Sequence, residues 1–420
     1  MQNLTPVSST TAHKTSLSLI FIIVFIDLLG FGIVLPILPR YAKRLHASHE
    51  TIGLLMASFS AMQFLFAPLW GRLSDRIGRR PVLLTGLAGS VIFYALFGIA
   101  TIYESLALMF IARTGAGIAG ATISTAQAYI ADATGNEDRA KGMALIGAAF
   151  GIGFTFGPIL GSVALNRSTL IPDELQPLNA LPGFLASGLS LLALLVAWVK
   201  LPESLRDQST PRQHTWLNTG AIREAVKVPT VGLLLLLFFI ATFAFSQFEV
   251  TLSLLTKEAF ALDEKFNFYI FTYIGLTLSI VQGILVRWLA PRLGEARMII
   301  LGSLFMGGGL WLVSMAAQQH STPALLAVIP ILVSGFSFLT PSAQALISRR
   351  SDPARQGEIM GVNQSASAMA RILAPVCGFK LFAHGTTLPY QVGALMLIPV
   401  LIIALLSARA GRDWVQAENI

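Results

Sequence analysis

The sequence predicts an all-α membrane protein in which twelve transmembrane helices form two six-helix halves. Three observations lead to this fold class. The mean hydropathy is +0.70, only 12% of the 420 residues are charged where soluble proteins have about 25%, and the second half of the chain repeats features of the first. A soluble domain is excluded because such a surface would not stay in water, and a disordered chain is excluded because disorder needs high charge and low hydrophobicity.

Twelve apolar runs reach the length of about 20 residues that a transmembrane helix needs. They cover residues 17–38, 51–71, 81–101, 105–130, 141–164, 181–200, 231–255, 267–289, 298–317, 323–346, 357–382 and 389–408, here called spans 1 to 12. Span 1 is too long for the apolar core of a signal peptide, so we expect it to be retained. The expected domains are a tail (1–16), a first half (17–200), a central loop (201–230), a second half (231–408) and a tail (409–420).

The distribution of Lys and Arg predicts the orientation of the chain. A net charge of +8 would suit nucleic-acid binding in a soluble protein, but in a membrane chain it marks cytoplasmic loops, so we expect no nucleic-acid partner. If the N-terminus lies inside, most Lys and Arg fall on the inner side, including four arginines within residues 72–80. Both termini are therefore predicted to be cytoplasmic, in a cell membrane that would be the inner membrane of a bacterium.

The two halves of the chain share matching segments in the same order. The segment that begins at Leu73 matches the one that begins at Leu289, and Arg139 matches Arg355. Six spans in each repeat return the chain to the same side, so the repeats are parallel and could rock around a site at the membrane midplane. Chance similarity between apolar helices is the alternative, which the matched charged and glycine loop residues disfavour.

The loop between spans 2 and 3 is a candidate inner gate. The loop contains an acidic residue among arginines, together with two glycines that allow a tight turn. The residues concerned are Gly71, Asp75, Arg76, Gly78, Arg79 and Arg80. The order of these residues resembles the G-x-L-x-D-R-x-G-R-R signature of the major facilitator superfamily, which implies the fold of that family. We expect a local charge network here and a contact of Asp75 with the start of span 11; a basic anchor that only sets topology is the alternative.

Two charged residues inside the first half are candidates for proton coupling. Asp27 lies about 15 Å from the inner end of span 1, and Arg113 lies about 12 Å into span 4. Charges at such depth are costly and functional by default, so we expect Asp27 to face the interior and Arg113 to tune it or pair with it. Their surroundings resemble span 1 of tetracycline efflux proteins and the R-x-x-x-G motif of the superfamily. A static clamp for Asp27 and an arginine that snorkels to the interface are the alternatives.

Span 5 carries small residues that permit close helix contact, together with a helix-bending proline. These residues are Gly153, Gly157, Pro158 and Gly161. The string resembles the G-x-x-x-G-P-x-x-G signature of proton-driven drug exporters in the superfamily, with Ser162 in place of the usual second glycine. We expect it to seal the two halves on the outer side; a plain glycine packing site is the alternative.

The second half contains further polar candidates for the cavity and for proton coupling. They are Gln247, Glu249, Gln282, Asn363, Gln364 and Arg371. Glu249 and Arg371 both lie in the outer halves of their spans, so they could pair, either for coupling or as a structural ion pair. The sequence around Glu249 resembles the tetracycline-transporter-like group, and Glu249 is the second candidate proton carrier after Asp27.

These features predict a transporter and not an enzyme. The sequence has no Walker A string and no zinc or triad motif, its one cysteine, Cys377, cannot form an intrachain disulfide, and we expect neither a cofactor nor a metal. The predicted function is proton-coupled export of a hydrophobic or amphiphilic, tetracycline-like small molecule by a monomer in the lipid bilayer. Two alternatives stay open: a facilitator or symporter of a metabolite such as a sugar or organic anion, and a membrane receptor or assembly factor that transports nothing.

Overall fold

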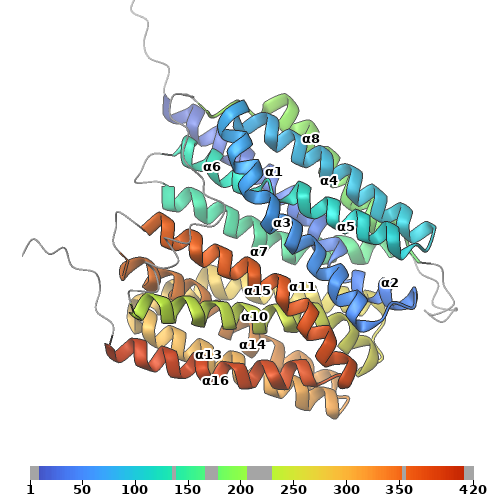
Figure 1. Ribbon diagram of the computed structural model, residues 1–420, viewed down its shortest axis with the longest axis vertical. Coiled ribbons are helices and arrows are strands. Elements are labelled where there is room, and N and C mark those ends of the chain that lie inside the picture. Colours follow the sequence, from blue (N-terminus) through green and yellow to red (C-terminus); the bar gives the residue numbers. More distant parts are fainter. Residues whose placement is uncertain (1–8, 135–138, 166–177, 206–228, 352–355, 411–420) are drawn as a thin grey trace, which may run out of the picture. The chain divides into compact units, whose positions relative to one another are not determined.

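The computed structural model describes residues 9–134, 139–165, 178–205, 229–351 and 356–410, and these ranges are helical with no strand among them. Figure 1 shows these helices, coloured along the chain. The tails 1–8 and 411–420 and most of the predicted central loop lie outside the described residues, as does Arg355 of the repeat.

Helices occur at all twelve predicted spans. Over the first half they are α1 (Ser9–Val34), α2 (Leu38–Arg44), α3 (His49–Ile77), α4 (Arg79–Ile102), α5 (Leu106–Gly120), α6 (Ile123–Ala133), α7 (Arg139–Ala164) and α8 (Leu181–Lys200). Over the second half they are α10 (Pro229–Glu258), α11 (Glu264–Ile280), the π-helical turn η1 (Val281–Leu285), α12 (Val286–Leu293), α13 (Glu295–Gln318), α14 (Thr322–Arg349), α15 (Gln356–His384) and α16 (Leu388–Ala410).

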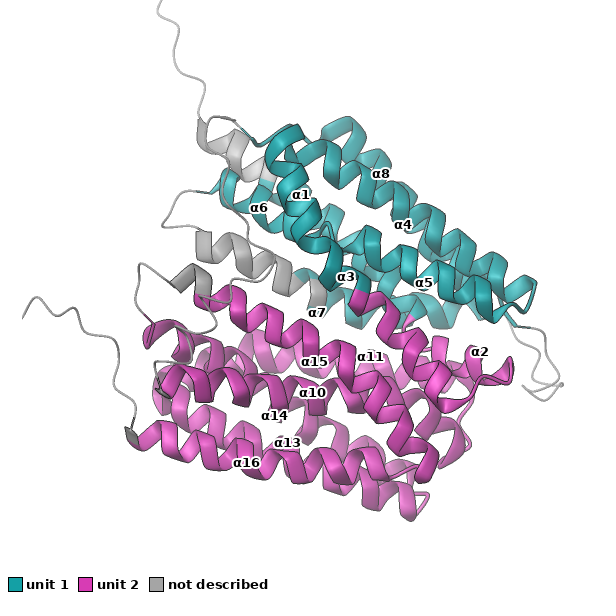
Figure 2. Cartoon of the chain, viewed as in Figure 1, with its two compact units in different colours: residues 1–34, 62–214 teal, residues 35–61, 215–420 magenta. Residues whose placement is uncertain are grey.

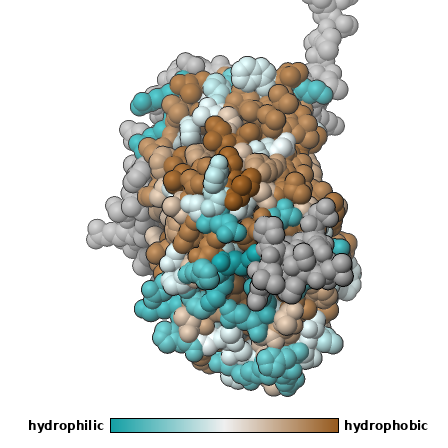
Figure 3. All heavy atoms as spheres, turned by 90° about the vertical axis from the view of Figure 1, so that its right-hand side faces the viewer, coloured by the Kyte–Doolittle hydropathy of each residue, from teal (hydrophilic) through white to brown (hydrophobic). Residues whose placement is uncertain are grey.

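The predicted membrane architecture is confirmed. Eleven stretches of the described chain are long and apolar enough to cross a membrane, and the described part of α7, Gly151–Ala164, is a shorter apolar helix at the remaining predicted span. Several spans are built from two or three helical pieces: α1 with α2, α5 with α6, and α11 with η1 and α12. Large apolar side chains such as Val199, Ile284 and Trp198 are exposed, and Figure 3 shows apolar residues over a broad part of one face, as lipid contact requires.

The described helices fall into two compact units. Unit 1 comprises Met1–Val34 and Met62–His214, and unit 2 comprises Leu35–Ala61 and Thr215–Ile420; Figure 2 colours them teal and magenta. The division follows the two predicted halves except at residues 35–61, which contain α2 and the start of α3 and group with unit 2. This segment is held there by hydrogen bonds from its own polar groups, described below.

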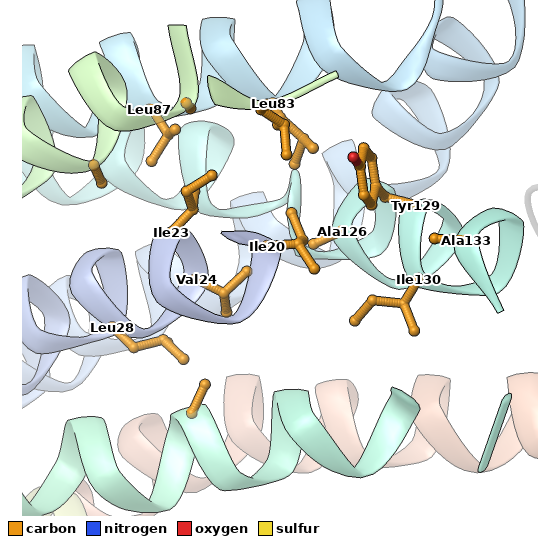
Figure 4. Close-up of a cluster of buried hydrophobic side chains, with 14 residues drawn as sticks. Ile20, Ile23, Val24, Leu28, Leu83, Leu87, Ala126, Tyr129, Ile130 and Ala133 are labelled. Atoms are coloured by element: carbon orange, nitrogen blue, oxygen red, sulfur yellow. The ribbon is translucent and has the colours of Figure 1, made fainter. Parts of the chain in front are cut away.

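Unit 1 is built around α1. This helix packs against α7 and α8, while α4 packs against α5 and α8. Figure 4 shows an apolar core of the unit, where Ile20, Ile23 and Val24 of α1 meet Leu83 and Leu87 of α4 and Tyr129 of α6. The core therefore fixes the helix that carries Asp27.

Unit 2 is built on two tight helix pairs. Helix α13 packs against α14 and α16, and α10 packs against α15 and α16. A methyl group at Gly302 would lie only 2.7 Å from the carbonyl oxygen of Gly335, so α13 and α14 cross where neither has a side chain. Phe243 of α10 packs with Ala370 and Ala374 of α15, which fixes the register of that second pair.

Candidate functional site

A polar cluster inside unit 1 surrounds Asp27. The hydroxyl of Ser190 on α8 donates a hydrogen bond of 3.2 Å to Oδ1 of Asp27, and the side chain of Ser90 on α4 also hydrogen-bonds to this carboxyl group. Ser90 is 3% exposed and Ser190 is fully buried. The carboxyl group of span 1 is therefore held by hydroxyl groups from spans 3 and 6.

Tyr94 of α4 is a further member of this cluster. Its ring packs on α1 where Gly30 leaves room, since a methyl group at Gly30 would lie 3.1 Å from Cε2 of Tyr94. Tyr94 is within electrostatic range of both charged residues. The guanidinium of Arg113, which is 2% exposed, lies over the ring of Phe31 at 5.8 Å from its centre, close enough for a cation–π contact.

The predicted direct pairing of Asp27 with Arg113 is not what the structure shows. Among the described residues no ion pair joins them, and Asp27 is hydrogen-bonded to serines instead. The reason is geometric: Asp27 is turned toward α4 and α8, whereas Arg113 is placed by α5 over Phe31. A carboxyl group among hydroxyl groups can accept hydrogen bonds when ionised and donate one when protonated, so this site can exchange a proton without losing its partners.

The glycines of span 5 bring α7 against the helix that carries Asp27. A methyl group at Gly157 would lie 2.8 Å from Cα of Gly32 and 2.9 Å from the carbonyl oxygen of Leu29, and one at Gly153 would lie 3.0 Å from Cβ of Leu28. These contacts are within unit 1. The close packing predicted from the string is present within unit 1, where its partner is span 1. Helix α7 continues through Pro158 to Ala164 and includes Gly161.

The candidate inner gate forms the local charge network that the sequence predicts. The guanidinium of Arg79, which is 3% exposed, contacts Asp75 at 2.5 Å and Asp132 at 2.9 Å, and donates a hydrogen bond of 2.6 Å to Ser74. Gly78 has φ 102°, the left-handed backbone that the turn before α4 requires. Arg76 is exposed, while Gly71 and Arg80 are half-buried.

Glu203 is a further member of this network, and no sequence motif points to it. Its carboxylate accepts hydrogen bonds from the backbone N–H groups of Arg79 (2.9 Å) and Arg80 (3.1 Å), so it caps the N-terminus of α4. A carboxylate there also meets the positive end of the helix dipole. An acidic residue directly after span 6 was the available clue, but nothing in the sequence links it to a loop more than 120 positions earlier.

The polar candidates of the second half differ in burial and in their hydrogen-bond partners. Gln247 is fully buried and donates a hydrogen bond of 3.0 Å to the carbonyl oxygen of Pro389. Asn363 is fully buried and Gln364 is exposed, because adjacent helical residues face different directions. Gln282 lies in the π-helical turn η1, a local distortion that frequently marks functional positions.

Glu249 and Arg371 are within electrostatic range of one another. No ion pair of 4.0 Å or less joins them in the part of the chain that the structure describes. Glu249 is half-buried and Arg371 is exposed. The described residues also contain no group of three or more His, Cys, Asp or Glu that could hold a metal ion.

Comparisons with known proteins point to one family. The family model of the Major Facilitator Superfamily matches residues 20–375. Tetracycline resistance protein, class E, of Escherichia coli is 34% identical over 364 residues, covering 84% of this chain and 85% of that protein. Major facilitator superfamily domain-containing protein 10 of Bos taurus is 29% identical, with 96% of both chains covered. The crystal structure of the human organic anion transporter MFSD10 (TETRAN) matches with a TM-score of 0.68 and 25% identity, covering 93% of this chain and 99% of that one.

Proposed function

This chain belongs to the Major Facilitator Superfamily, and from that premise we propose that it exports a hydrophobic or amphiphilic small molecule in exchange for protons. It would act as a monomer in a cell membrane, with both termini in the cytoplasm. The kinship with a tetracycline resistance protein supports a tetracycline-like substrate. Whichever small molecule it carries, the chain is a membrane transporter of this family.

The observation that carries the proton-coupling proposal is the setting of Asp27. A carboxyl group in the middle of span 1 is bound by the hydroxyls of Ser90 and Ser190 and has no ion-pair partner among the described residues. An ion-paired carboxylate would resist protonation, because the paired cation stabilises the charged form. Hydroxyl partners serve both protonation states, which suits a group that must load and release a proton in every cycle.

In the proposed cycle, a proton from outside binds Asp27, and substrate bound from the cytoplasmic side promotes its release to the inside. Proton binding and substrate binding must therefore compete, because in antiport the protein crosses between its two states with either the proton or the substrate bound, and not with both. Glu249, within electrostatic range of Arg371, is the second candidate carrier.

The proposal is tested by tetracycline uptake into everted membrane vesicles. An exporter accumulates tetracycline in the vesicle lumen when the lumen is acidic, and a protonophore abolishes that accumulation. Accumulation that is unchanged by the protonophore would contradict proton coupling, and uptake no greater than in vesicles without the protein would contradict the tetracycline-like substrate.

Transport of an organic anion is the second candidate function. Arg113 is a buried cation in the middle of a span, and the human relative is named as an organic anion transporter. This function predicts that a fluorescent organic anion equilibrates across vesicles whether or not a pH gradient is imposed. An Arg113→Gln variant should then lose anion flux more than tetracycline flux.

A further inference from the structure

Unit 2 contains a hydrogen-bond network between the chain that follows span 1 and the chain that joins spans 7 and 8. Its centre is Arg40 on the short helix α2, which is 1% exposed. The guanidinium donates hydrogen bonds of 3.0 Å to the carbonyl oxygens of Ser253 and Leu262 and one of 2.8 Å to the hydroxyl of Thr256. Three acceptors from one end of α10 and the loop after it therefore surround one arginine.

A second set of bonds converges on the carbonyl group of Pro36, four residues earlier. The hydroxyl of Ser253 donates to it at 2.5 Å, and the side-chain amide of Asn267 donates to it at 3.0 Å. Thr256 also bonds to Asn267 at 2.9 Å, so the two sets form one connected network. Because Ser253 takes part in both sets, neither can open without disturbing the other.

The segment that carries Pro36 and Arg40 is joined to unit 1 on both sides. Helix α1 belongs to unit 1 up to Val34, and α3 passes from unit 2 into unit 1 between Ala61 and Met62. By sequence, residues 35–61 are part of the first six-span repeat, yet they bind spans 7 and 8 of the second repeat. The predicted orientation places this network at the outer end of the molecule.

We propose that this network, made of Pro36, Arg40, Ser253, Thr256, Leu262 and Asn267, is a latch that holds the outer end of the transporter closed. In a two-repeat transporter the outer end opens when the first repeat leaves the second there. Opening at this end would remove Arg40 from three acceptors at once and return a buried guanidinium to water. The bonds exist only in the closed state, so they shift the equilibrium between states toward it.

The ion pairs close to the latch are too weak to hold the closed state without it. Lys43 and His49 each approach Glu258 at 4.0 Å, the outer limit of an ion pair, and Lys43 is 37% exposed. Pairs of that kind contribute little, because water screens them and long side chains lose freedom in forming them. Lys43→Gln is therefore a matched control: it removes one positive charge from the same helix without touching the latch.

The experiment measures how often the outer end is open in the purified, full-length protein. Cys377 is exposed and is first changed to Ser; spin labels are then attached at Glu50→Cys on α3 and Lys265→Cys on α11. Both positions are exposed and neither belongs to the latch. Pulsed electron paramagnetic resonance in lipid nanodiscs then gives the distribution of distances between the labels, without any need for a substrate.

With Arg40→Gln, the population at long distance should rise at least tenfold over the parent, since the loss of even one hydrogen bond from a charged group shifts the equilibrium between the states by about that factor. Lys43→Gln should leave the distribution unchanged. If Arg40→Gln does not fold, Ser253→Ala is measured in its place and should shift the population in the same direction by a smaller factor. Equal distributions in the parent and in the latch variant that folds would overturn the proposal and leave the network a static brace. Because no transport is measured, this outcome is separate from a failure of the proposed antiport.

Discussion

Substitution of Gly157 by Ala should destabilise the protein, because α7 crosses α1 there with backbone against backbone. The added methyl would lie 2.8 Å from Cα of Gly32 and 2.9 Å from both the carbonyl carbon of Gly32 and the carbonyl oxygen of Leu29. None of these atoms can rotate away, so the helices themselves must separate. Overpacking of this kind costs about 1–3 kcal/mol, and the rigid contacts place Gly157 at the upper end of that range.

The net effect is smaller, because alanine stabilises a helix relative to glycine by about 1 kcal/mol. Gly157→Ala should therefore lower the free energy of unfolding by about 2 kcal/mol. Gly188 on α8 supplies the control: it is exposed, and a methyl group there meets no atom within 4 Å. In Gly188→Ala only the helix propensity of the residue changes, so this substitution should raise the free energy of unfolding by about 0.5–1 kcal/mol.

Thermal unfolding of the two purified variants measures this difference. A domain of 150–250 residues shifts its Tm by about 2–4 °C for each kcal/mol, so Gly157→Ala should melt about 4–8 °C below the parent and Gly188→Ala slightly above it. The Gly32→Ala, Gly157→Ala double variant should lose less than the sum of its two single variants, because the first substitution already separates the helices. A Gly157→Ala protein that melts with the parent would refute the close crossing of α1 and α7.

Three further substitutions test the cap of α4, the candidate inner gate and the second candidate proton carrier. Glu203→Gln removes the charge from the cap of α4 and should lower the free energy of unfolding by about 1 kcal/mol. The variant should therefore have a lower Tm and still bind tetracycline, and an unchanged Tm would show that the cap is dispensable. Asp75→Asn removes the charge that pairs with Arg79 and should raise the inward-open population, as measured by distances between labels on the two inner loops; an equal population in the parent would leave this loop a topology anchor. Glu249→Gln should slow pH-driven tetracycline uptake less than Asp27→Asn does, and a larger loss would make Glu249 the main carrier.

The sequence predicts the helices of this protein well because each span is encoded locally. Length and apolar composition alone place a helix at every predicted run. The ion pair of Asp75 with Arg79 joins opposite charges four positions apart in one motif, on the two sides of the turn at Gly78. Asp27 and Arg113 stand out because a charge in an apolar helix is rare. These signals need no knowledge of which helices are neighbours.

The partners of those residues could not be predicted, because they depend on how the helices pack. Ser90 and Ser190 resemble any small polar residue in an apolar span until α4 and α8 are seen beside Asp27. The contact of Gly157 with Gly32 likewise requires the crossing of α1 with α7. Arg40 counts in the sequence only as a cation outside the membrane, whereas the structure buries it among acceptors from the end of α10 and the loop after it.

Proton release from the purified protein tests most directly whether Asp27 carries the transported proton. Tetracycline is added to the parent in weakly buffered detergent solution, and the pH of the solution is followed. If Asp27 is the carrier, the parent releases protons on binding, whereas Asp27→Asn, which keeps the shape of the side chain but cannot ionise, binds tetracycline and releases none. Proton release by Asp27→Asn equal to that of the parent would contradict the claim.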